Sequence, residues 1–517
     1  VRFKPVKDGG EQVGYTASPT GTQLLAAIAE QPGATWLIGN EPDCHTMDNM
    51  RSDWYAYAYH DIYHIIKGAD PTAKIAAGNI VQPTKQRFMY LDRVLVAYEE
   101  AYGEPLPTDL WSTHSYILCE NCYPYKPPGE PFAWGACWVP DWPSYGASYE
   151  ISTFYSVYDH WDMDIFKDRL VEFRQWMYDN GYRNHGLVLP EYGILFYEGL
   201  VSGMTPEDDI EFMEAGFEWM QEARDPVLGY GPDDDRLVQR WAWFSLDHGS
   251  YPGGSLFNPS TDQPEAIGTA FHEATSQITP TTTLLLLDAG AAVDPPAPQP
   301  TFTATVTITA ANAGNIQMTP PPNLNVSHAY SSSTGTTIQM PITTTDVPEL
   351  DCCGDHHQVA LTLTDLIKSR HRVCWEASQP LTVTLPAPTA CISFGVDLLV
   401  DPLRAETFFS PITEPVTRTF SADVRAAGEI DTGTPVTVTL YQDTESARIP
   451  VTQVSVRALS GGDDTERVEI QCPNLTEGLH PYCPQAQTAY LASEMACGLL
   501  WINPPYNSYL PLISAQP

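Results

Sequence analysis

The first half of the chain alternates short apolar runs with longer segments in which apolar residues recur every three or four positions. The short runs predict strands that are buried on both faces, and the longer segments predict amphipathic helices. The predicted strands are 1–6, 35–39, 74–81, 110–116, 186–191 and 237–246, and the predicted helices are 20–29, 54–67, 88–102, 166–180, 210–223 and 265–276.

This alternation of strands and helices predicts right-handed βαβ units and a parallel sheet. We therefore expect residues 1–276 to form a (β/α)8 barrel of the TIM type. Only six strands are found, whereas a complete barrel needs eight. If 237–246 is the eighth strand, the chain lacks the first two: they were removed, another segment fills their place, or the barrel is open. The chain opens at Val1 with no Met and no signal peptide, so we expect a processed or truncated N-terminus.

After residue 276 the pattern changes, and the fold class is expected to change from α/β to all-β. Residues 277–300 are rich in Pro and Thr and read as a linker. Beyond it, Val and Thr alternate in short stretches separated by turn residues, which predicts β-sandwich domains at 301–405 and 406–517. The clearest predicted strands are 301–309, 358–364, 381–385, 417–424 and 436–441.

A long insertion at 117–165 follows the predicted strand 110–116 and is rich in Trp, Tyr and Pro. On a barrel, the loops that follow strands build the active-site face. Aromatic side chains there would suit a sugar-binding cleft, because pyranose faces stack on rings. A loop that packs on itself and is stapled by a disulfide is an equally good interpretation.

The charge of the chain narrows the choice of partners. The 517 residues include 26 basic and 64 acidic ones, for a formal net charge of −38. Phosphate groups would be repelled, so nucleic acid and anionic membranes are disfavoured, whereas a neutral polysaccharide meets no repulsion. The acidity can equally serve only to keep a secreted protein soluble. No segment is long and apolar enough to span a bilayer.

The 11 cysteines, scattered through loop-rich sequence, predict disulfides and an extracellular or cell-surface location. The odd count leaves at least one thiol unpaired, and Cys44 is a candidate. Sequons at Asn325 and Asn474 are compatible with secretion and glycosylation. Residues 352–357, Cys-Cys-Gly-Asp-His-His, offer metal ligands, but a loop with two disulfide cysteines and exposed histidines is the preferred interpretation.

Two glutamates stand out by their context. Glu41 and Glu191 each end an apolar run, at the carboxyl tip of a predicted barrel strand. A carboxylate there is costly to bury and does not help the strands to pack, yet it lies where barrel enzymes keep their catalytic groups. Glycoside hydrolysis with retention needs two such carboxyls, one as acid/base and one as nucleophile.

The strings around these glutamates resemble clan A of the glycoside hydrolases. Asn40-Glu41-Pro42 follows one strand, and Glu191 ends a strand three further on. In that clan the acid/base follows an Asn on strand four, and the nucleophile ends strand seven. Counting back from 237–246 as the eighth strand puts Glu41 on the fourth and Glu191 on the seventh. The Gly-Asn-Glu-Pro-Asp string is also similar to that of endo-β-1,3-glucanases with a compact catalytic core.

The resemblance implies roles for further residues. Asn40 would bind the sugar 2-hydroxyl, and His114 or Tyr116 would orient Glu191. Trp243 or Trp241 would form the floor of the central subsite; both lie on the same side of their strand, so only depth separates them. No cofactor is expected.

The leading hypothesis is a secreted retaining glycoside hydrolase that cleaves a β-linked polysaccharide or oligosaccharide by double displacement. Glu41 would be the acid/base and Glu191 the nucleophile. The alternative is a non-catalytic, glycan-binding or filament-forming surface protein with a degenerate barrel, able to self-associate or assemble at the cell surface. The missing strands and the sandwich-rich tail favour this alternative, and the two well-placed glutamates disfavour it.

Overall fold

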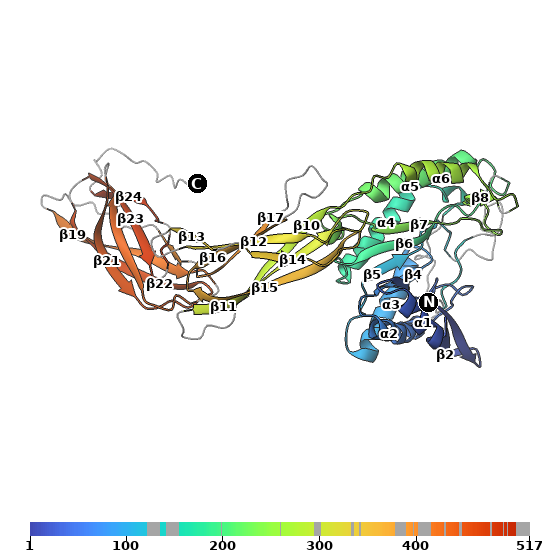
Figure 1. The fold of residues 1–517 in the computed structure, drawn as a ribbon, viewed down its shortest axis with the longest axis horizontal. Helices are drawn as coiled ribbons and strands as arrows, with labels where there is room; N and C mark the ends of the chain where they lie inside the picture. The colour runs from blue at the N-terminus through green and yellow to red at the C-terminus, as the bar shows by residue number, and fades with distance from the viewer. Residues whose placement is uncertain are drawn as a thin grey trace. The chain divides into compact units, whose positions relative to one another are not determined.

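The computed structural model of the chain divides into two compact units, whose elements are labelled in Figure 1. Unit 1 comprises Val1–Thr282 together with two short segments from later in the chain, Asn312–Gln317 and Asp351–Asp355, and unit 2 comprises the rest. The structure describes all residues except 121–134, 141–154, 198, 259, 294–300, 332–335, 341–342, 378–388, 397, 402–414, 429–430, 444–446, 476–477, 490, 494 and 503–517.

Unit 1 is built on a five-stranded parallel sheet in the order β3-β4-β5-β6-β7. Strands adjacent in the sheet are consecutive in the chain, and all four pairings are parallel. The strands are β3 (Thr35–Leu37), β4 (Lys74–Ile80), β5 (Leu110–Thr113), β6 (Gly186–Tyr192) and β7 (Arg240–Trp243). Every strand therefore ends at the same edge of the sheet, where the loops that follow can meet.

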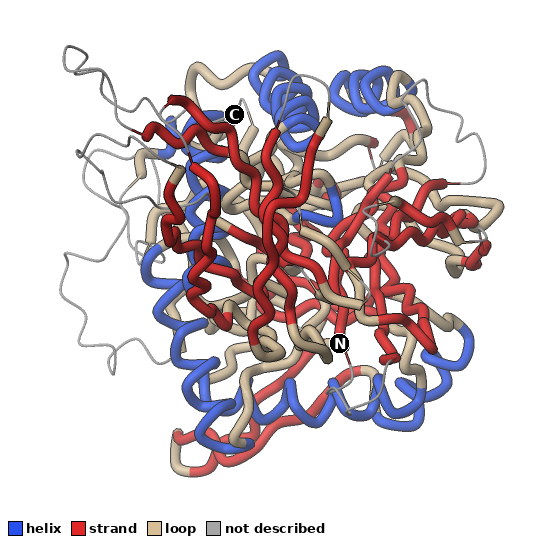
Figure 2. Tube along the Cα trace, turned by 90° about the vertical axis from the view of Figure 1, so that its left-hand side faces the viewer, coloured by secondary structure: helices blue, strands red, loops and turns tan. Residues whose placement is uncertain are grey.

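A helix follows each strand of this sheet, as the alternating pattern predicts. Among the described residues the α-helices all fall within unit 1, and they are drawn in blue in Figure 2. They are α1 (Gly21–Glu30), α2 (Ser52–Ala69), α3 (Lys85–Tyr102), α4 (Met163–Asp179), α5 (Pro206–Glu222) and α6 (Ala266–Ser276). Their apolar stripes and the strands share one hydrophobic core, which includes Ile62, Leu91, Trp111 and Leu189.

The prediction of a (β/α)8 barrel lacking only its first two strands is wrong. The described residues form an open parallel sheet of five strands, and strand outweighs helix in the chain, 40% against 23%. The sheet has two edges, β3 and β7, where a closed barrel would have none. These edges approach each other at one end, because Nη1 of Arg240 on β7 lies 3.4 Å from Oγ1 of Thr35 on β3.

The segment expected to be the first observed barrel strand forms a hairpin instead. β1 (Arg2–Asp8) pairs antiparallel with β2 (Glu11–Ser18), in a sheet of its own. The physical reason is the two-residue turn between them, Gly9-Gly10, in which both residues have positive φ. Two glycines tolerate this conformation without steric cost, and such turns match the twist of paired strands. Only Val1 reaches the parallel sheet, through backbone bonds to Leu37 and Gly39.

The returning segment Asp351–Asp355 packs at the amino-terminal end of the parallel strands. Asp355 pairs with Lys74 at the start of β4 (3.2 Å), and Asp351 pairs with Arg240 at the start of β7 (3.2 Å). Tyr230 donates a hydrogen bond to the Gly354 carbonyl. This end of the sheet is therefore occupied, and the carboxyl end is left for a site.

Unit 2 is built of four sheets. Their strand orders are β10-β11-β15, then β13-β12-β16-β17 with β14 also on β12, then β18-β19-β22 and β21-β20-β23-β24. The strand pairs of the last three sheets are antiparallel. Buried and half-buried side chains alternate along the first eight residues of β11, so one face of this strand enters the core of unit 2. The strands are β10 (Leu284–Val293), β11 (Thr301–Asn312), β12 (Asn323–Ser331), β13 (Thr337–Gln339), β14 (Thr343–Asp346), β15 (Asp355–Ile367), β16 (Arg370–Ala377), β17 (Thr389–Gly395), β18 (Leu398–Val400), β19 (Val416–Ala426), β20 (Val436–Asp443), β21 (Arg448–Val456), β22 (Asp464–Leu475), β23 (Gly478–Gln487) and β24 (Gly498–Ile502).

The segment 277–300, expected to be a linker, holds a ten-residue strand, β10. Its Leu-rich start, Leu284–Leu287, supplies a buried side chain to the core of unit 2. The predicted strand 381–385 lies outside the described residues. Two disulfides join positions of neighbouring strands in unit 2, Cys374–Cys391 and Cys483–Cys497.

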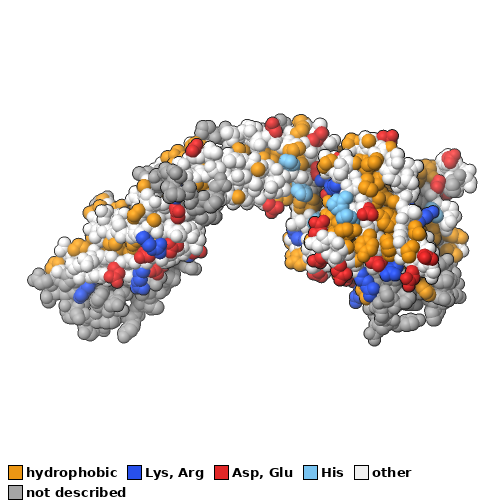
Figure 3. Space-filling model, turned by 90° about the horizontal axis from the view of Figure 1, so that it is seen from below, with side chains coloured by type: hydrophobic (Ala, Val, Ile, Leu, Met, Phe, Trp, Pro, Cys, Tyr) orange, Lys and Arg blue, Asp and Glu red, His pale blue; other side chains and the backbone are white. Residues whose placement is uncertain are grey.

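Exposed apolar side chains are scattered over unit 1. Figure 3 shows them among charged and histidine side chains on the side seen from below in Figure 1, where α1 and α2 lie. Exposed apolar residues of these elements and their neighbours include Val13, Leu25, Ile65 and Val96. No helix among the described residues is long and apolar enough to cross a membrane.

Candidate active site

Glu41 lies just beyond the carboxyl end of β3, and its backbone is held in an uncommon conformation. Its φ is +48°, in the left-handed region that non-glycine residues rarely adopt. The Glu41 N–H donates to the Asn79 carbonyl at 2.8 Å, and the Glu41 carbonyl accepts from the Cys44 N–H at 3.0 Å. Such a conformation persists only where the surroundings dictate it, and it is concentrated at functional sites.

Glu191 comes from β6, three strands away from β3 in the sheet. The loop that continues β5 runs beside it, because the Ser115 N–H donates to the Glu191 carbonyl at 3.0 Å. This bond, and a parallel bridge between Ser115 and Tyr192, extend the pairing of β5 and β6 beyond the named strands. His114 and Tyr116 flank Ser115, so both lie at the level of Glu191.

The structure brings Glu41, His114, Tyr116 and Glu191 together. Nδ1 of His114 lies 2.9 Å from Oε1 of Glu41 and 3.5 Å from Oε2 of Glu191. The Tyr116 hydroxyl donates to Oε2 of Glu191 at 3.1 Å. One carboxyl oxygen of each glutamate and a ring nitrogen of His114 all lie within 4.8 Å of one another.

The two carboxyl groups differ in access to solvent. The side chain of Glu191 is 28% exposed, and that of Glu41 is 9% exposed. The Glu191 carboxyl is therefore the more accessible of the two to a molecule that binds at this edge of the sheet.

The buried His114 and Tyr116 supply hydrogen-bonding groups of defined character. Burial acts to lower the pKa of His114, but its hydrogen bond to Glu41 and the charges of Glu41 and Glu191 outweigh burial and raise it. His114 is therefore biased toward its cationic form between two carboxyls. Burial and the charge of Glu191 raise the pKa of Tyr116 well above its usual value, so Tyr116 stays a neutral donor.

A buried ion network lies beside Glu41. Arg87 is fully buried; its Nη1 donates to Oδ2 of Asp43 at 3.0 Å, and its Nη2 donates to Oε2 of Glu120 at 2.8 Å. Arg87 also donates to the backbone carbonyls of Asp43 and Cys137. Burial raises the pKa of Asp43 to about 6, against the lowering effect of Arg87. The network fixes the loop after β3 against the segment after β5.

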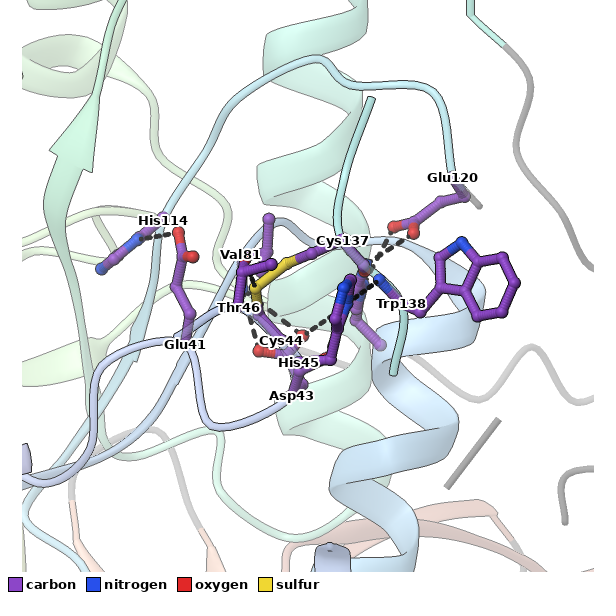
Figure 4. Close-up of a disulfide and its surroundings, with 11 residues drawn as sticks. Glu41, Asp43, Cys44, His45, Thr46, Val81, His114, Glu120, Cys137 and Trp138 are labelled. Carbon is purple, nitrogen blue, oxygen red and sulfur yellow. Dashed lines mark hydrogen bonds and ion pairs between the residues drawn. A yellow bond between two sulfur atoms is a disulfide. The ribbon is translucent and has the colours of Figure 1, made fainter. Parts of the chain in front are cut away.

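The same two segments are joined covalently, because Cys44 forms a disulfide with Cys137. The prediction that Cys44 carries a free thiol is therefore wrong. In Figure 4, Glu41 and His114 lie on one side of the disulfide, and His45 and Trp138 on the other. A carboxyl oxygen of Glu41 and both Sγ atoms lie within 4.8 Å of one another.

The tryptophans proposed for the subsite floor lie in the core layer of unit 1. Trp243 is 8% exposed, and its Nε1 donates to the Gly254 carbonyl at 2.7 Å. Trp241, on the same side of β7, packs toward Phe217 of α5. Phe244, one position on, instead packs edge-to-face on Tyr116, with ring centroids 6.1 Å apart. Because side chains alternate along a strand, Phe244 faces away from Trp241 and Trp243 and packs on the residue that bonds Glu191; sequence reasoning missed it.

Asn40 is adjacent to Glu41 and half-buried. Its backbone N–H donates to Oδ2 of Asp48 at 2.8 Å, and the same oxygen accepts the N–H of Phe3. Asp48 thereby fixes the backbone on the amino-terminal side of Glu41. The expected contact between the Asn40 side chain and a sugar hydroxyl stays a prediction.

Two groups of side chains in the described part of unit 1 are close enough to hold a metal ion. One is Glu41, His114 and Glu191, and the other is Glu41 with Cys44 and Cys137. The second is closed to metals while its cysteines form a disulfide. The vicinal cysteines Cys352 and Cys353, expected to be in disulfides, are both free.

The comparisons with known proteins give weak likenesses. No protein-family model and no curated protein sequence matches the chain. Among solved structures it is similar to BuGH86 in complex with neoagarooctaose, at 11% identity and a TM-score of 0.29, over 84% of this chain and 65% of that one. It is similar to Bacteroides uniformis β-glucuronidase 2, at 9% identity and a TM-score of 0.31, over 96% and 57%.

A likeness of the same strength extends to red sea bream transglutaminase, at 12% identity and a TM-score of 0.23, over 48% of this chain and 34% of that one. The chain thus spans from about a third to about two thirds of the length of these proteins. Glycoside hydrolases are among the structural neighbours, but at such TM-scores the likeness supports no argument. The function must be argued from the site itself.

Proposed function

We propose that the chain is a retaining glycoside hydrolase, with Glu41 as acid/base and Glu191 as nucleophile. The observation that supports this most is the convergence of the two carboxyls, with oxygens within 4.8 Å across His114. Retaining glycosidases hold their carboxyls roughly 5–5.5 Å apart, whereas inverting ones leave roughly 6.5–9.5 Å for a water molecule. The short separation favours attack by a carboxylate over attack by water.

The proposed reaction has two displacements. Glu191 attacks the anomeric carbon and forms a glycosyl ester while Glu41 gives its proton to the departing glycosidic oxygen. Glu41 then takes a proton from water, and that water attacks the anomeric carbon and frees Glu191. Tyr116 orients the nucleophile through its bond to Oε2, and His114 orients Glu41 through the hydrogen bond of 2.9 Å between Nδ1 and Oε1.

The substrate class follows from charge and from the aromatic side chains near the site. The net charge of −38 disfavours a polyanion, so we assign a neutral β-linked polysaccharide or oligosaccharide. Phe244, packed on Tyr116, is the proposed floor of the central subsite, in place of Trp241 or Trp243. Asn40, next to Glu41, is the proposed partner of the sugar 2-hydroxyl.

An extracellular or cell-surface location accompanies this proposal. Three disulfides form among the described residues, Cys44–Cys137, Cys374–Cys391 and Cys483–Cys497. Disulfides persist in oxidising compartments and are rare in the cytosol. A polysaccharide too large to cross a membrane must also be cleaved outside the cell.

The first prediction concerns the nucleophile. Glu191→Gln should lower the release of reducing ends from a panel of neutral β-glycans by roughly 10³-fold or more, because it removes the group that forms the covalent intermediate. The matched control is Glu100→Gln, an exposed glutamate of α3, which should leave the rate unchanged. Wild-type-like hydrolysis by the Glu191 variant would rule out the assignment.

Removal of metal separates this proposal from a metal-dependent hydrolase built on Glu41, His114 and Glu191. Dialysis against EDTA should leave the glycosidase activity intact, since carboxylates alone do the proposed chemistry. Loss of activity in EDTA, restored by a divalent cation, would instead assign the three side chains as metal ligands.

The open sheet favours one other function, glycan binding without turnover. A five-stranded sheet with two edges offers fewer loops around its carboxyl end than a closed barrel does. In that case wild-type protein and the Glu191→Gln variant would retain the same glycan on a column, and neither would release sugar. Hydrolysis by wild type alone decides for the enzyme.

A further inference from the structure

The Cys44–Cys137 disulfide lies directly beside the proposed acid/base. Both sulfur atoms are within 4.8 Å of a Glu41 carboxyl oxygen. The disulfide joins the loop after β3 to the long segment after β5, across 93 residues of chain. The strands of the parallel sheet are paired through their own backbones, so the disulfide adds a link between loops at the carboxyl edge of the sheet. Its position therefore calls for an explanation at the site.

The conformation of Glu41 gives one reason. A residue with φ of +48° tends to relax toward the ordinary regions unless neighbouring bonds prevent it. The Cys44 amide provides one of these bonds, since its N–H closes a turn on the Glu41 carbonyl. Cys44 is thus both the residue that holds this turn and one end of the cross-link.

The other end of the cross-link is fixed independently of the disulfide. The Cys137 carbonyl accepts a hydrogen bond from the buried Arg87 at 2.6 Å. The next residue, Trp138, exchanges two bonds with His45: its carbonyl accepts from the His45 N–H, and its own N–H donates to Nδ1 of the His45 ring, both at 3.0 Å. Figure 4 shows His45 and Trp138 bonded to each other beside the disulfide. Cys137 is therefore a fixed point to which Cys44 is tied.

We propose that this disulfide is a positioning element for Glu41, which holds the carboxyl of the acid/base in the place where it can protonate the leaving oxygen. The inference rests on the proposed glycosidase function. Cys44 and Cys137 do not touch the reacting atoms; they limit the movement of the turn on which Glu41 lies. Glu191 lies on β6 and is held by Ser115 and Tyr116, directly after β5, so the disulfide acts on the turn of Glu41 more directly than on the nucleophile.

Because Glu41 is the proposed acid/base and Glu191 the proposed nucleophile, substrates with different leaving groups can test the role of the disulfide. 2,4-Dinitrophenolate departs without a proton, so its release depends on the nucleophile alone, whereas phenolate needs the acid. The probes are the phenyl and 2,4-dinitrophenyl β-glycosides of the disaccharide that wild-type protein releases from the glycan panel. A displacement of about 1 Å at a catalytic group costs roughly 100-fold in rate.

The double variant C44A/C137A should lower kcat/KM for the phenyl glycoside by about 10- to 100-fold, and for the dinitrophenyl glycoside by less than about threefold. Glu41→Ala should show the same selectivity with a larger loss. The matched control is C374A/C391A, which removes a disulfide of unit 2 and should change neither rate. An equal loss on both substrates would overturn the positioning role, and so would no loss on either.

Two further measurements keep the test decisive. If circular dichroism shows that the double variant does not fold, wild-type protein in dithiothreitol replaces it, and C374A/C391A in dithiothreitol is its control. The rate on the phenyl glycoside should again fall more than the rate on the dinitrophenyl glycoside. If the variant folds, it should be insensitive to dithiothreitol; further selective loss would place the effect at another disulfide. Wild-type protein that cleaves neither glycoside and no glycan would overturn the proposed function itself, a result distinct from non-selective loss in the variant.

Discussion

At the scale of single residues, the position of Glu41 destabilises the fold in two ways, through its backbone conformation and through the burial of its carboxyl. Its left-handed backbone costs about 1–3 kcal/mol, and its carboxyl is nearly buried. Compensation comes from bonds to Asn79 and Cys44 and from the imidazole of His114. A residue that served packing alone would adopt an ordinary conformation and an apolar side chain, so the arrangement is consistent with a chemical role.

The pKa of His114 leads to a prediction about stability. The pKa of His114 in the folded protein is raised above 6.5 by Glu41 and Glu191. Protonated His114 therefore stabilises the folded state, and neutral His114 does not. The resulting stability is fully present below about pH 6.5 and is lost as the pH rises through the folded pKa. The free energy of unfolding of wild type minus that of His114→Gln should therefore decrease with increasing pH above about 6.5.

Urea unfolding of unit 1, followed by tryptophan fluorescence at several pH values, measures this difference. His64→Gln, which alters an exposed histidine of α2, serves as the control and should show little dependence of this kind. A difference between wild type and His114→Gln that stays constant or grows with pH would contradict the raised pKa.

At the scale of elements, the loops that follow the parallel strands are tied to one another. The disulfide joins the loops after β3 and β5, and in the chain-entropy model a closed loop of this size contributes about 4–5 kcal/mol. His160 joins the loops after β5 and β6: its Nδ1 bonds the Ile117 carbonyl at 2.9 Å, and its Nε2 accepts from the Leu195 N–H at 3.0 Å. These links hold the carboxyl end of an open sheet in one arrangement.

Since Nε2 of His160 accepts a hydrogen bond, the ring must be neutral in the folded protein, and burial lowers its pKa to about 4. An unfolded His160 is protonated below about pH 6.5, so unfolding takes up a proton between these values. The stability that His160 contributes is full above about pH 6.5 and falls by about 3 kcal/mol as the pH drops to 4 and below.

His160→Gln should remove this acid sensitivity. Wild type should lose more stability than the variant between pH 7 and pH 4.5, as measured by urea unfolding of unit 1. The variant itself is expected to be less stable at pH 7, because one of the two loop contacts is weakened. Parallel pH profiles for the two proteins would show that His160 is not buried as a neutral ring.

At the scale of the whole molecule, two separate hydrophobic cores divide the chain. One is formed by the helices and the parallel sheet, and the other by the antiparallel sheets. The chain passes from one unit to the other more than once, because Asn312–Gln317 and Asp351–Asp355 belong to unit 1 while the strands around them belong to unit 2. Each core supports its own cooperative folding unit.

Calorimetry should therefore resolve two unfolding transitions. Trp111→Ala, in the core of unit 1, should destabilise one transition by about 3–5 kcal/mol, and Trp375→Ala, in the core of unit 2, should destabilise the other. Each variant is the control for the other. If both substitutions shifted a single transition, the two units would unfold as one.

The local pattern of apolar and polar residues was enough to predict many of the helices and strands and to single out Glu41 and Glu191. The periodic apolar runs predicted β4 to within one residue and α3 to within three, because a buried strand or an amphipathic helix shows its burial in its own spacing. The strand-end positions of Glu41 and Glu191 were visible for the same reason. Gly9-Gly10 is also a sequence signal for the hairpin of β1 and β2, whereas the apolar run alone suggests a barrel strand at 1–6.

Only tertiary structure decided how these elements close and which side chains meet. An alternating βα pattern is the same for an open sheet and a closed barrel, since closure depends on pairing between strands far apart in the chain. The partner of Cys44 lies 93 residues away, and the turn of Phe244 toward Tyr116 depends on the register of β7. The spacing of residues along the chain does not predict such contacts, because they form only when distant segments pack together.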